Sequence, residues 1–286
     1  MKKILVTGGL GFIGSHLVEL LLKDKSNKIV VVDNLISESS SRNNMFEGVE
    51  YHIEDIRRLE TVELGDDFDV VFHLAALARI QPSFKNPVKY FEIDALGTSK
   101  VLDLARRSNA KVVYAGSSSA YGGPMLNPYA FAKYTGEQLC EMYSKVYGIN
   151  TVIARFFNVY GERQPVSGPY ATVVGVFEGQ YSGGGPLTIT GTGEQRRDFT
   201  HVSDIVAGLS ALSSLETEGE VFNLGTGTNY SINELASMFN GAKVDYIPPR
   251  PGEAKMTLAD ITKTTEKTGW TPKVKIQSYV EEFISN

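Results

Sequence analysis

The chain has 286 residues, of which 42% are hydrophobic and 21% are charged, and its net charge at neutral pH is -5. This composition is typical of a globular protein, and the length suits one large domain or two small ones. The negative charge argues against a protein that binds nucleic acid through broad electrostatic attraction, while leaving room for local basic clusters that grip one phosphorylated ligand.

Cysteine and histidine usage excludes several kinds of site. The single cysteine, Cys140, rules out an internal disulfide and a multi-cysteine metal site, and in a predicted helix over residues 137–147 a buried thiol is favoured. His73 and His201 lack paired ligands at useful spacing, so we expect no metal. No stretch reaches the ~18 apolar residues that span a bilayer, and no signal-peptide cleavage site follows the N-terminal apolar run. We expect a soluble, cytoplasmic protein.

The first half of the chain alternates short apolar runs with longer amphipathic segments. Runs rich in β-branched residues, without strict alternation, are typical of strands buried on both faces of a parallel sheet. They cover residues 4–6, 29–32, 70–74, 112–115 and 152–155. The segments between them predict helices over residues 14–22, 87–107 and 129–147. This alternation predicts an α/β fold with a Rossmann-type doubly wound parallel sheet.

The pattern changes near Gly161, after which turns separate shorter elements. A strand signal at residues 221–224 is expected to rejoin the main sheet. We therefore predict one domain over residues 1–160 and a smaller mixed α/β region over residues 161–286, with an interleaved boundary. Residues 37–41, which are rich in serine, predict a loop.

A glycine-rich turn follows the first predicted strand and leads into a helix. Gly8, Gly11 and Gly14 are spaced to allow a tight turn, close approach of a pyrophosphate and helix packing, with Phe12 and Ile13 between them. The helix N-terminus adds amide donors and a favourable dipole for phosphate. The pattern predicts a dinucleotide-binding loop.

Acidic residues follow the next two strand signals. Asp33 is placed to bind the hydroxyls of the adenosine ribose and would repel a 2′-phosphate, which favours NAD over NADP. Its neighbour Asn34 is expected at the cofactor with it. Asp55 and Ile56 follow a strand signal at residues 49–52, where the carboxylate could accept from the adenine amine. A surface turn explains Asp55 equally well.

A tyrosine and a lysine share one face of the predicted helix 129–147. Tyr129 and Lys133 are four residues apart, which places their Cβ atoms about 5–6 Å apart. A free tyrosine, with a pKa of about 10, is a poor base at neutral pH. A neighbouring ammonium and an oxidised nicotinamide would both lower that pKa. The serines at 117–119, where another strand ends, could bind the reacting hydroxyl; the alternative is a plain polar turn.

Together these motifs, in this order, resemble the extended short-chain dehydrogenase/reductase family, in particular its NAD-dependent nucleotide-sugar epimerases. The resemblance covers nearly the whole chain. It is carried by residues 7–14, 33, 55–56, 73–76, 117–122, 129 with 133, 155–158, 197–199, 250–253 and 259–260. It implies a NAD-binding domain followed by a region that binds a nucleotide sugar.

The resemblance also implies individual roles. Tyr129 would be the general base, Lys133 would bind the nicotinamide ribose and Ser117 would assist proton transfer, with Ser118 and Ser119 as open alternatives. Further residues implied at the cofactor are Leu74, Ala75, Ala76 and Phe157. Residues implied at the substrate diphosphate are Asn158, Arg197 and Arg250, since the fork of arginine matches phosphate oxygens. Thr257 would stand at the sugar pocket, where a small side chain leaves room for an N-acetyl group.

The same family suggests a reaction. Its members move a hydride from the sugar C4 to NAD, and dehydratases and decarboxylases among them carry an acid just after the catalytic serine. This chain has Ser118 and Ser119 there, which favours 4-epimerisation of a UDP-sugar, either UDP-glucose/galactose or the N-acetylated forms. The alternatives are a NAD-dependent nucleotide-sugar dehydratase or reductase, and a non-catalytic NAD-binding protein.

The chain departs from the family pattern in two places. Residues 123–128 make a shorter loop than usual before Tyr129, which predicts that a lid over the sugar is missing. Asp94 stands where the family usually has Asn and adds a negative charge near the cofactor. The resemblance further implies a homodimer that packs through the helices 87–107 and 129–147.

Overall fold

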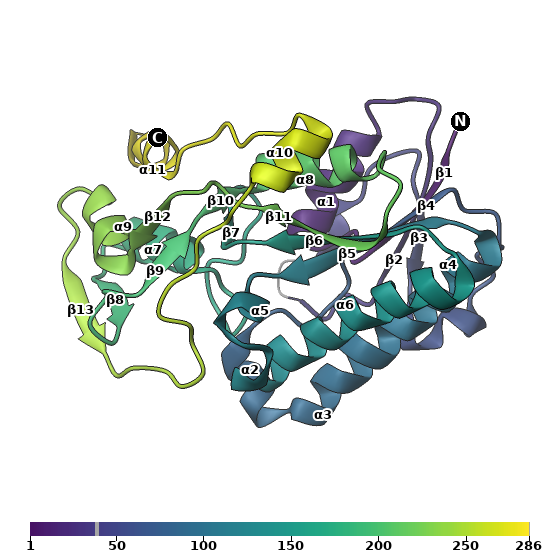
Figure 1. Cartoon of the computed structure of the whole chain (residues 1–286). Coiled ribbons are helices and arrows are strands. Elements are labelled where there is room, and N and C mark those ends of the chain that lie inside the picture. The colour runs from purple at the N-terminus through teal and green to yellow at the C-terminus, as the bar shows by residue number, and fades with distance from the viewer. Residues whose placement is uncertain (38–39, 286) are drawn as a thin grey trace.

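The structure is a computed structural model that describes residues 1–37 and 40–285. Its centre is a seven-stranded sheet in the order β11-β6-β5-β4-β1-β2-β3, in which each neighbouring pair runs parallel (Figure 1). The strands are β1 (Lys3–Thr7), β2 (Lys28–Asp33), β3 (Glu50–Ile53), β4 (Val70–His73), β5 (Lys111–Ser117), β6 (Thr151–Phe156) and β11 (Glu218–Leu224). The predicted Rossmann-type α/β sheet is confirmed. The predicted loop at residues 37–41 includes 38 and 39, which lie outside the described residues.

Helices cover both faces of this sheet because alternate strand residues point to opposite sides. Leu5 faces one core, and Ile4 and Val6 face the other. The first core is covered by α3 (Pro87–Tyr90), a π-helical segment (Phe91–Gly97), α4 (Thr98–Ser108) and α6 (Pro128–Tyr147). The second is covered by α1 (Phe12–Leu21), α8 (Val202–Leu212) and the residues after α10 (Thr262–Thr268).

The predicted helix over residues 87–107 is interrupted. Its middle, Phe91–Gly97, is a π-helical turn, the kind of local widening that often occurs at functional sites. There the side chain of Asp94 points inward, and its Oδ1 accepts a hydrogen bond from the amide of Leu77 at 2.7 Å. The hydroxyl of Thr98 closes the turn by donating to the carbonyl of Asp94. The wider turn thus brings a carboxylate to the loop after β4.

Local signals define the ends of α6. The side chain of Asn127 caps the helix by accepting from the amide of Ala130 at 2.8 Å, Pro128 occupies the first turn, and Gly148 ends it with a φ of +72°. Tyr129 and Lys133 therefore sit in the first turns, as predicted. Cys140 is a buried free thiol, also as predicted.

A smaller region extends from the sheet and has its own apolar core around Phe177, Leu235 and Phe239 (Figure 1, left). It contains α7 (Val173–Ser182), β8 (Leu187–Thr190), β9 (Arg196–Asp198), β12 (Asn229–Ser231), α9 (Ile232–Met238), β13 (Val244–Ile247) and α11 (Ile276–Ser285). The shorter elements are η1 (Arg42–Asn44), η2 (Ile56–Thr61), α2 (Ile80–Lys85), α5 (Ser119–Gly122), η4 (Pro124–Leu126), β7 (Val159–Tyr160) and β10 (Thr200–His201). Because β11 returns to the main sheet, as predicted, the chain crosses between the two parts. The boundary at residue 160 stays a prediction.

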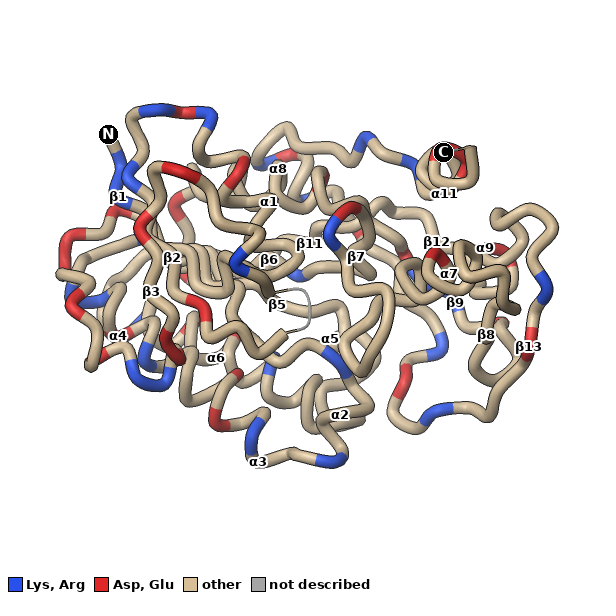
Figure 2. Tube along the Cα trace, turned by 180° about the vertical axis from the view of Figure 1, so that it is seen from behind, with Lys and Arg blue, Asp and Glu red and all other residues tan. Residues whose placement is uncertain are grey.

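Charge is spread over the whole molecule. Figure 2 shows basic and acidic residues interspersed along the trace of both parts, in keeping with the small net charge of -5. Within residues 1–37 and 40–285, no helix combines the length and the apolar character needed to cross a bilayer.

Candidate active site

The glycine loop between β1 and α1 packs too tightly for a side chain at Gly8, Gly9 and Gly14. A Cβ atom on Gly14 would lie 2.0 Å from the carbonyl oxygen of Gly8, and one on Gly8 would lie 2.8 Å from the amide nitrogen of Ala75. Gly8 also has a φ of +73°, which favours glycine. Gly11 lines the adjoining cavity. The loop therefore has the close backbone approach that a dinucleotide pyrophosphate requires.

Asp33 ends β2 with a buried carboxylate at the same cavity. Its Oδ2 accepts from the amide of Leu10 at 3.0 Å, and its Oδ1 accepts from the amide of Leu35 at 2.8 Å. Burial raises the pKa of Asp33, and these backbone donors oppose the rise. The carboxylate is thus held rigidly beside the glycine loop, at the place where a Rossmann-type sheet receives a ribose.

Asp55 differs from the expectation drawn from the sequence. Arg57 occupies both of its carboxylate oxygens, donating from Nε at 3.0 Å and from Nη2 at 2.9 Å. Asn34 donates to the same carboxylate at 3.1 Å. Asp55 does not line the cavity, whereas its neighbours Glu54 and Ile56 do. The Asp55 side chain therefore binds Arg57 and Asn34, and its predicted contact with the adenine amine stays a prediction.

One cavity of about 1100 Å³ gathers the other predicted site residues at the carboxyl edge of the sheet. A pocket for one drug-sized ligand is ~300–1,000 Å³, so this cavity has room for a dinucleotide and a second ligand. The predicted residues that line it are Gly8, Gly11, Phe12, Ile13, Gly14, Asp33, Asn34, Ile56, Leu74, Ala75, Ala76, Ser117, Tyr129, Lys133, Phe157, Asn158, Arg197, Arg250 and Thr257.

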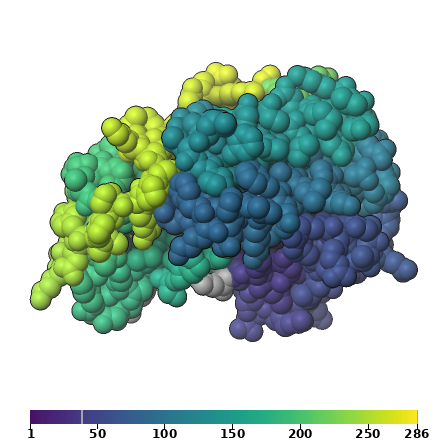
Figure 3. Space-filling model, turned by 90° about the horizontal axis from the view of Figure 1, so that it is seen from below, coloured from purple at the N-terminus to yellow at the C-terminus, as the bar shows by residue number. Residues whose placement is uncertain are grey.

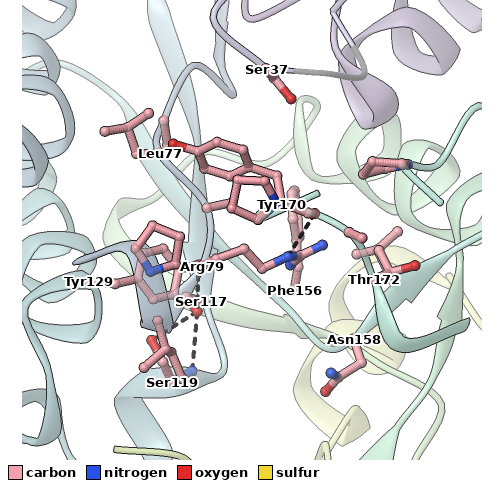
Figure 4. A pocket seen from close by; sticks show the side chains of 18 of the residues that line it. Ser37, Leu77, Arg79, Ser117, Ser119, Tyr129, Phe156, Asn158, Tyr170 and Thr172 are labelled. Carbon is pink, nitrogen blue, oxygen red and sulfur yellow. Dashed lines mark hydrogen bonds between the residues drawn. The ribbon is translucent and has the colours of Figure 1, made fainter. Parts of the chain in front are cut away.

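Tyr129 meets one serine of the 117–119 run directly. Its Oη donates to Oγ of Ser117 at 3.2 Å, and Ser119 supports that serine from its amide at 3.2 Å and its hydroxyl at 2.9 Å (Figure 4). Burial raises the pKa of Tyr129, and the hydrogen bond with Ser117 opposes the rise. Of the three serines left open by the sequence, Ser117 is therefore the one in contact with the tyrosine.

Lys133 lies one helical turn after Tyr129 and is only 5% exposed. Its Nζ sits 4.3 Å from the centre of the Tyr114 ring, in a cation–π contact. Burial lowers the pKa of Lys133, and the carboxylates of Asp94 and Glu137 oppose this by favouring the ammonium. Burial therefore disfavours the Lys133 ammonium that was predicted to assist Tyr129, while the two carboxylates favour it.

Asp94 is a buried carboxyl group close to this centre, with 1% of its surface exposed. Its Oδ1 accepts from the amide of Leu77, whereas its Oδ2 has no hydrogen-bond partner among the described residues. Burial raises the pKa of Asp94 to about 7, against the opposing charge of Lys133. The group therefore titrates near neutral pH.

Arg79 also lines the cavity, and the sequence analysis missed it. Its backbone has φ 154° and ψ 146°, a region that glycine alone adopts readily, at a cost of about 1–3 kcal/mol. Its Nε donates to the carbonyl of Tyr170 at 2.9 Å across the cavity (Figure 4). The available signal was its position, just after the run at residues 74–76, on the edge of the sheet where ligands bind.

The opposite end of the cavity carries two further arginines, Arg197 and Arg250. Nη2 of Arg197 lies 3.6 Å from a carboxylate oxygen of Glu253. Burial lowers the pKa of Arg197, and Glu253 opposes this. The hydroxyl of Thr257 reaches Oδ1 of Asn158 at 3.5 Å beside them. Two guanidinium groups in one cavity suit a diphosphate.

The segment that carries Arg250 contacts the end of the short loop before Tyr129. Gln81 donates to the carbonyl of Pro251 at 2.9 Å, and Asn127 donates to that of Gly252 at 3.0 Å. Figure 3 shows this yellow-green segment lying against the blue part of the chain. Met125, at the tip of the short loop, is 80% exposed. The 250–254 segment thus packs against the loop before Tyr129, and the predicted absence of a lid stays a prediction.

Asp198 is a fully buried carboxylate that connects three segments of the chain near Arg197. It accepts from the amide and hydroxyl of Thr226 at 2.8 and 2.7 Å, from the amide of Gly227 at 3.0 Å and from the amide of Ala259 at 3.1 Å. It therefore joins β9 to the turn after β11 and to the segment before α10. The sequence analysis noted Asp198 only as part of a motif.

Residues 4–225 match the model of the NAD-dependent epimerase/dehydratase family. The chain belongs to this family. The motifs that carried the resemblance to extended short-chain dehydrogenases/reductases, and to their nucleotide-sugar epimerases, are thereby confirmed at the level of the family.

Similar proteins span nearly the whole chain. A putative UDP-glucose 4-epimerase of Methanocaldococcus jannaschii is 35% identical, with 99% of this chain and 97% of that protein covered. UDP-glucuronic acid decarboxylase 6 of Arabidopsis thaliana is 33% identical, covering 96% and 85%. The structure of UDP-glucuronic acid 4-epimerase from Bacillus cereus, with UDP-glucuronic acid and NAD, aligns with a TM-score of 0.90 at 32% identity, covering 99% of both chains.

The protein is an enzyme of this family and its cofactor is NAD. Its residues fit the cofactor, since the glycine loop has no room for side chains at Gly8 and Gly14 and Asp33 stands beside it. No group of three or more potential metal ligands occurs within the described ranges. An epimerase and a decarboxylase have similar sequence identity to the chain. Identity alone therefore does not distinguish their reactions, and the distinction must rest on the side chains of the site.

We expect Asp94→Asn to stabilise the protein at pH 8 by roughly 2–4 kcal/mol. An acid whose pKa is higher in the folded than in the unfolded chain binds its proton more tightly when folded. The free energy of unfolding therefore falls as the pH rises from the ordinary 3.8 of an aspartate to about 7, and stays reduced above that. Asparagine carries no such penalty. Urea unfolding at pH 4, 6 and 8 measures the difference.

The matched control is Asp245→Asn, because Asp245 is exposed on β13. Its unfolding free energy should follow that of the unaltered protein at each pH. A stability difference for Asp94→Asn that is the same at pH 4 and pH 8 would contradict the assignment of a raised pKa to Asp94.

Proposed function

We propose that the enzyme catalyses the 4-epimerisation of a UDP-sugar, either UDP-glucose/galactose or the N-acetylated forms, through a transient 4-keto sugar. The observation that carries the proposal is the 3.2 Å contact between Oη of Tyr129 and Oγ of Ser117 at the carboxyl edge of the sheet. The contact supports the proposal because it joins the side chain that would accept the proton to a second hydroxyl, in a cavity that Arg197 and Arg250 also line.

In this proposal, bound NAD supplies the acceptor that takes a hydride from the sugar C4 and later returns it. Tyr129 takes the proton of the C4 hydroxyl while Ser117 holds that hydroxyl in place. Return of the proton by Tyr129, after the ring has turned, completes the inversion. Lys133 binds the nicotinamide ribose, and the diphosphate is held by Asn158, Arg197 and Arg250.

The positions of the acidic residues that line the cavity favour epimerisation over elimination. Among the described residues that line it, the carboxylates are Asp33, Glu54 and Glu253. Asp33 is braced by backbone amides beside the glycine loop, with Glu54 on the same strand edge, and Glu253 faces Arg197. No lining carboxylate therefore stands next to Ser117 to act as the second acid or base of an elimination.

We expect purified enzyme with bound NAD to convert at least one of four sugars: UDP-glucose, UDP-galactose, UDP-N-acetylglucosamine or UDP-N-acetylgalactosamine. The product should be the C4 epimer, of equal mass and without net NADH, because the hydride returns to the sugar. NMR and mass analysis of the products test this. Tyr129→Phe should lower kcat by about 10²–10⁴-fold, since it removes the proton acceptor.

Tyr134→Phe is the control, because Tyr134 lies on the same helix and does not line the cavity. A product lighter by one water would establish a dehydratase instead. Net NADH consumption with a keto-sugar would establish a reductase. NAD binding without turnover of any nucleotide sugar would leave the non-catalytic alternative.

Thr257 is proposed to leave room for an N-acetyl group. The side chain lines the cavity and is only 7% exposed. Thr257→Tyr should lower kcat/KM for N-acetylated sugars by roughly tenfold or more relative to plain sugars, because a larger ring fills the space. Thr257→Ser, which keeps the space, should retain the original ratio. Comparable turnover of both sugars by Thr257→Tyr would contradict the proposal.

A homodimer is proposed from the apolar side chains that remain exposed on the helices of one sheet face. Val88 is 66% exposed, Phe131 39% and Val146 63%, and the rings of Phe91 and Phe131 pack edge to face at 5.8 Å. Such a face suits a second copy of the chain, packed as a helical bundle.

Phe131→Glu should therefore shift the protein from dimer to monomer in analytical ultracentrifugation, because it places a charge within the apolar contact. Tyr246→Glu, at a 60% exposed ring on β13, should leave the sedimentation unchanged. A monomeric unaltered protein, or a Phe131→Glu variant that sediments like it, would contradict this interface.

A further inference from the structure

Arg79 is a second cation, besides Lys133, in the part of the cavity that Tyr129 lines. Arg79 extends from the loop between β4 and α2 into the space near Tyr129, where its Nε donates to the carbonyl of Tyr170 (Figure 4). Within residues 1–37 and 40–285, no carboxylate lies within 4.0 Å of its guanidinium. Arg79 is half-buried, and a half-buried cation without a carboxylate partner is unfavourable, which suggests a role for its charge.

The backbone conformation of Arg79 also supports a functional role for this residue. Its φ of 154° and ψ of 146° belong to a region that suits glycine and strains any residue with a Cβ. A glycine would make this turn without strain. The chain nevertheless carries a large charged side chain here, and strain of this kind concentrates at functional sites.

Titratable groups face Tyr129 from each element packed around it. They are Arg79 of the loop after β4, Tyr90 of α3, Asp94 of the π-helical segment, Tyr114 of β5 and Glu137 of α6. Lys133 lies one helical turn after Tyr129, and Tyr170 of the segment before α7 interacts with Tyr90. Burial raises the pKa of Tyr129 most, and the negative charges of Asp94 and Glu137 raise it further. The hydrogen bond with Ser117 and, after it, the positive charge of Arg79 lower it.

The two cations of the site differ in how well they keep their charge. Burial lowers the pKa of both Lys133 and Arg79. An ammonium loses its proton readily when it is desolvated, whereas a guanidinium stays protonated throughout the working range of a protein. A guanidinium can therefore offset the negative charge of Asp94 at pH values where a desolvated ammonium has lost its proton.

We propose that Arg79 is a positioning residue for proton transfer: its permanent positive charge, held in the cavity by the carbonyl of Tyr170, offsets the carboxylate of Asp94 near Tyr129. Arg79 acts through Tyr129 and not on the sugar. Its effect on kcat rests on the proposed function, whereas its effect on the ionisation of Tyr129 does not.

The test is the titration midpoint of Tyr129 in the NAD-loaded protein without substrate. It is obtained from the tyrosinate absorbance of the protein minus that of its Tyr129→Phe variant. Arg79→Met should raise the midpoint by about one pH unit, and Arg79→Lys should raise it by less, because an ammonium keeps its charge less well than a guanidinium when it is desolvated. Adding Asp94→Asn to Arg79→Met should lower the midpoint again. Lys85→Met, which removes another cation of the cavity, should leave it unchanged.

Arg79→Gly distinguishes an effect of the Arg79 charge on Tyr129 from a purely structural role of Arg79. Glycine relieves the backbone strain, so the Tm should stay level or rise while the midpoint shifts as in Arg79→Met. A residue that only linked two loops through Tyr170 would give a lower Tm and an unshifted midpoint, which would overturn the proposal.

Kinetics complete the test. The acidic limb of the pH profile of kcat should shift upward with the midpoint, and KM for the UDP-sugar should change less than about twofold. A large rise in KM with an unshifted midpoint would show that Arg79 binds an anion of the ligand, and would overturn the proposal. A shifted midpoint in a protein that turns over no UDP-sugar would sustain the role of Arg79 and reject the proposed reaction.

Discussion

Ionisable side chains around Tyr129 lie where little water reaches them, and this desolvation governs the chemistry of the site. Lys133 is 5% exposed and Asp94 is 1% exposed, so solvent stabilises neither charge. In such surroundings each charge acts strongly on its neighbours, and the pKa values of Asp94 and Lys133 move toward one another. A proton acceptor placed here is therefore tuned by several groups together. The parallel sheet makes this possible, because strands that run the same way deliver their ends to one buried edge.

Local sequence was sufficient where the physical cause is local. Strand β2 was predictable from a run of β-branched residues ending in Asp33, and the glycine loop from spacing that only a tight turn explains. Tyr129 and Lys133 share a helix face because they are four residues apart. The return of β11 to the main sheet was also predictable, since its apolar run resembles those of the other buried strands.

Features that depend on distant contacts were not predictable in the same way. Asp55 binds Arg57 and also Asn34, which lies 21 residues away in the chain, and the second contact could not be read from local sequence. The π-helical turn that carries Asp94 leaves the apolar pattern of its helix nearly intact, so periodicity gave no sign of it. Arg79 looks like a surface residue until its strained backbone and its contact with Tyr170 are seen.

The order of the strands also has a consequence for synthesis of the chain. Strand β6 pairs with β5 on one side and with β11 on the other, and Thr151 is separated from Glu218 by more than sixty residues. While the ribosome makes the intervening segment, β6 remains an open edge with unpaired backbone groups. The nascent chain therefore passes through a stage in which its largest sheet is complete on one side only. Chaperone demand and aggregation during translation should be greatest in that interval, and both should fall once residue 224 has emerged.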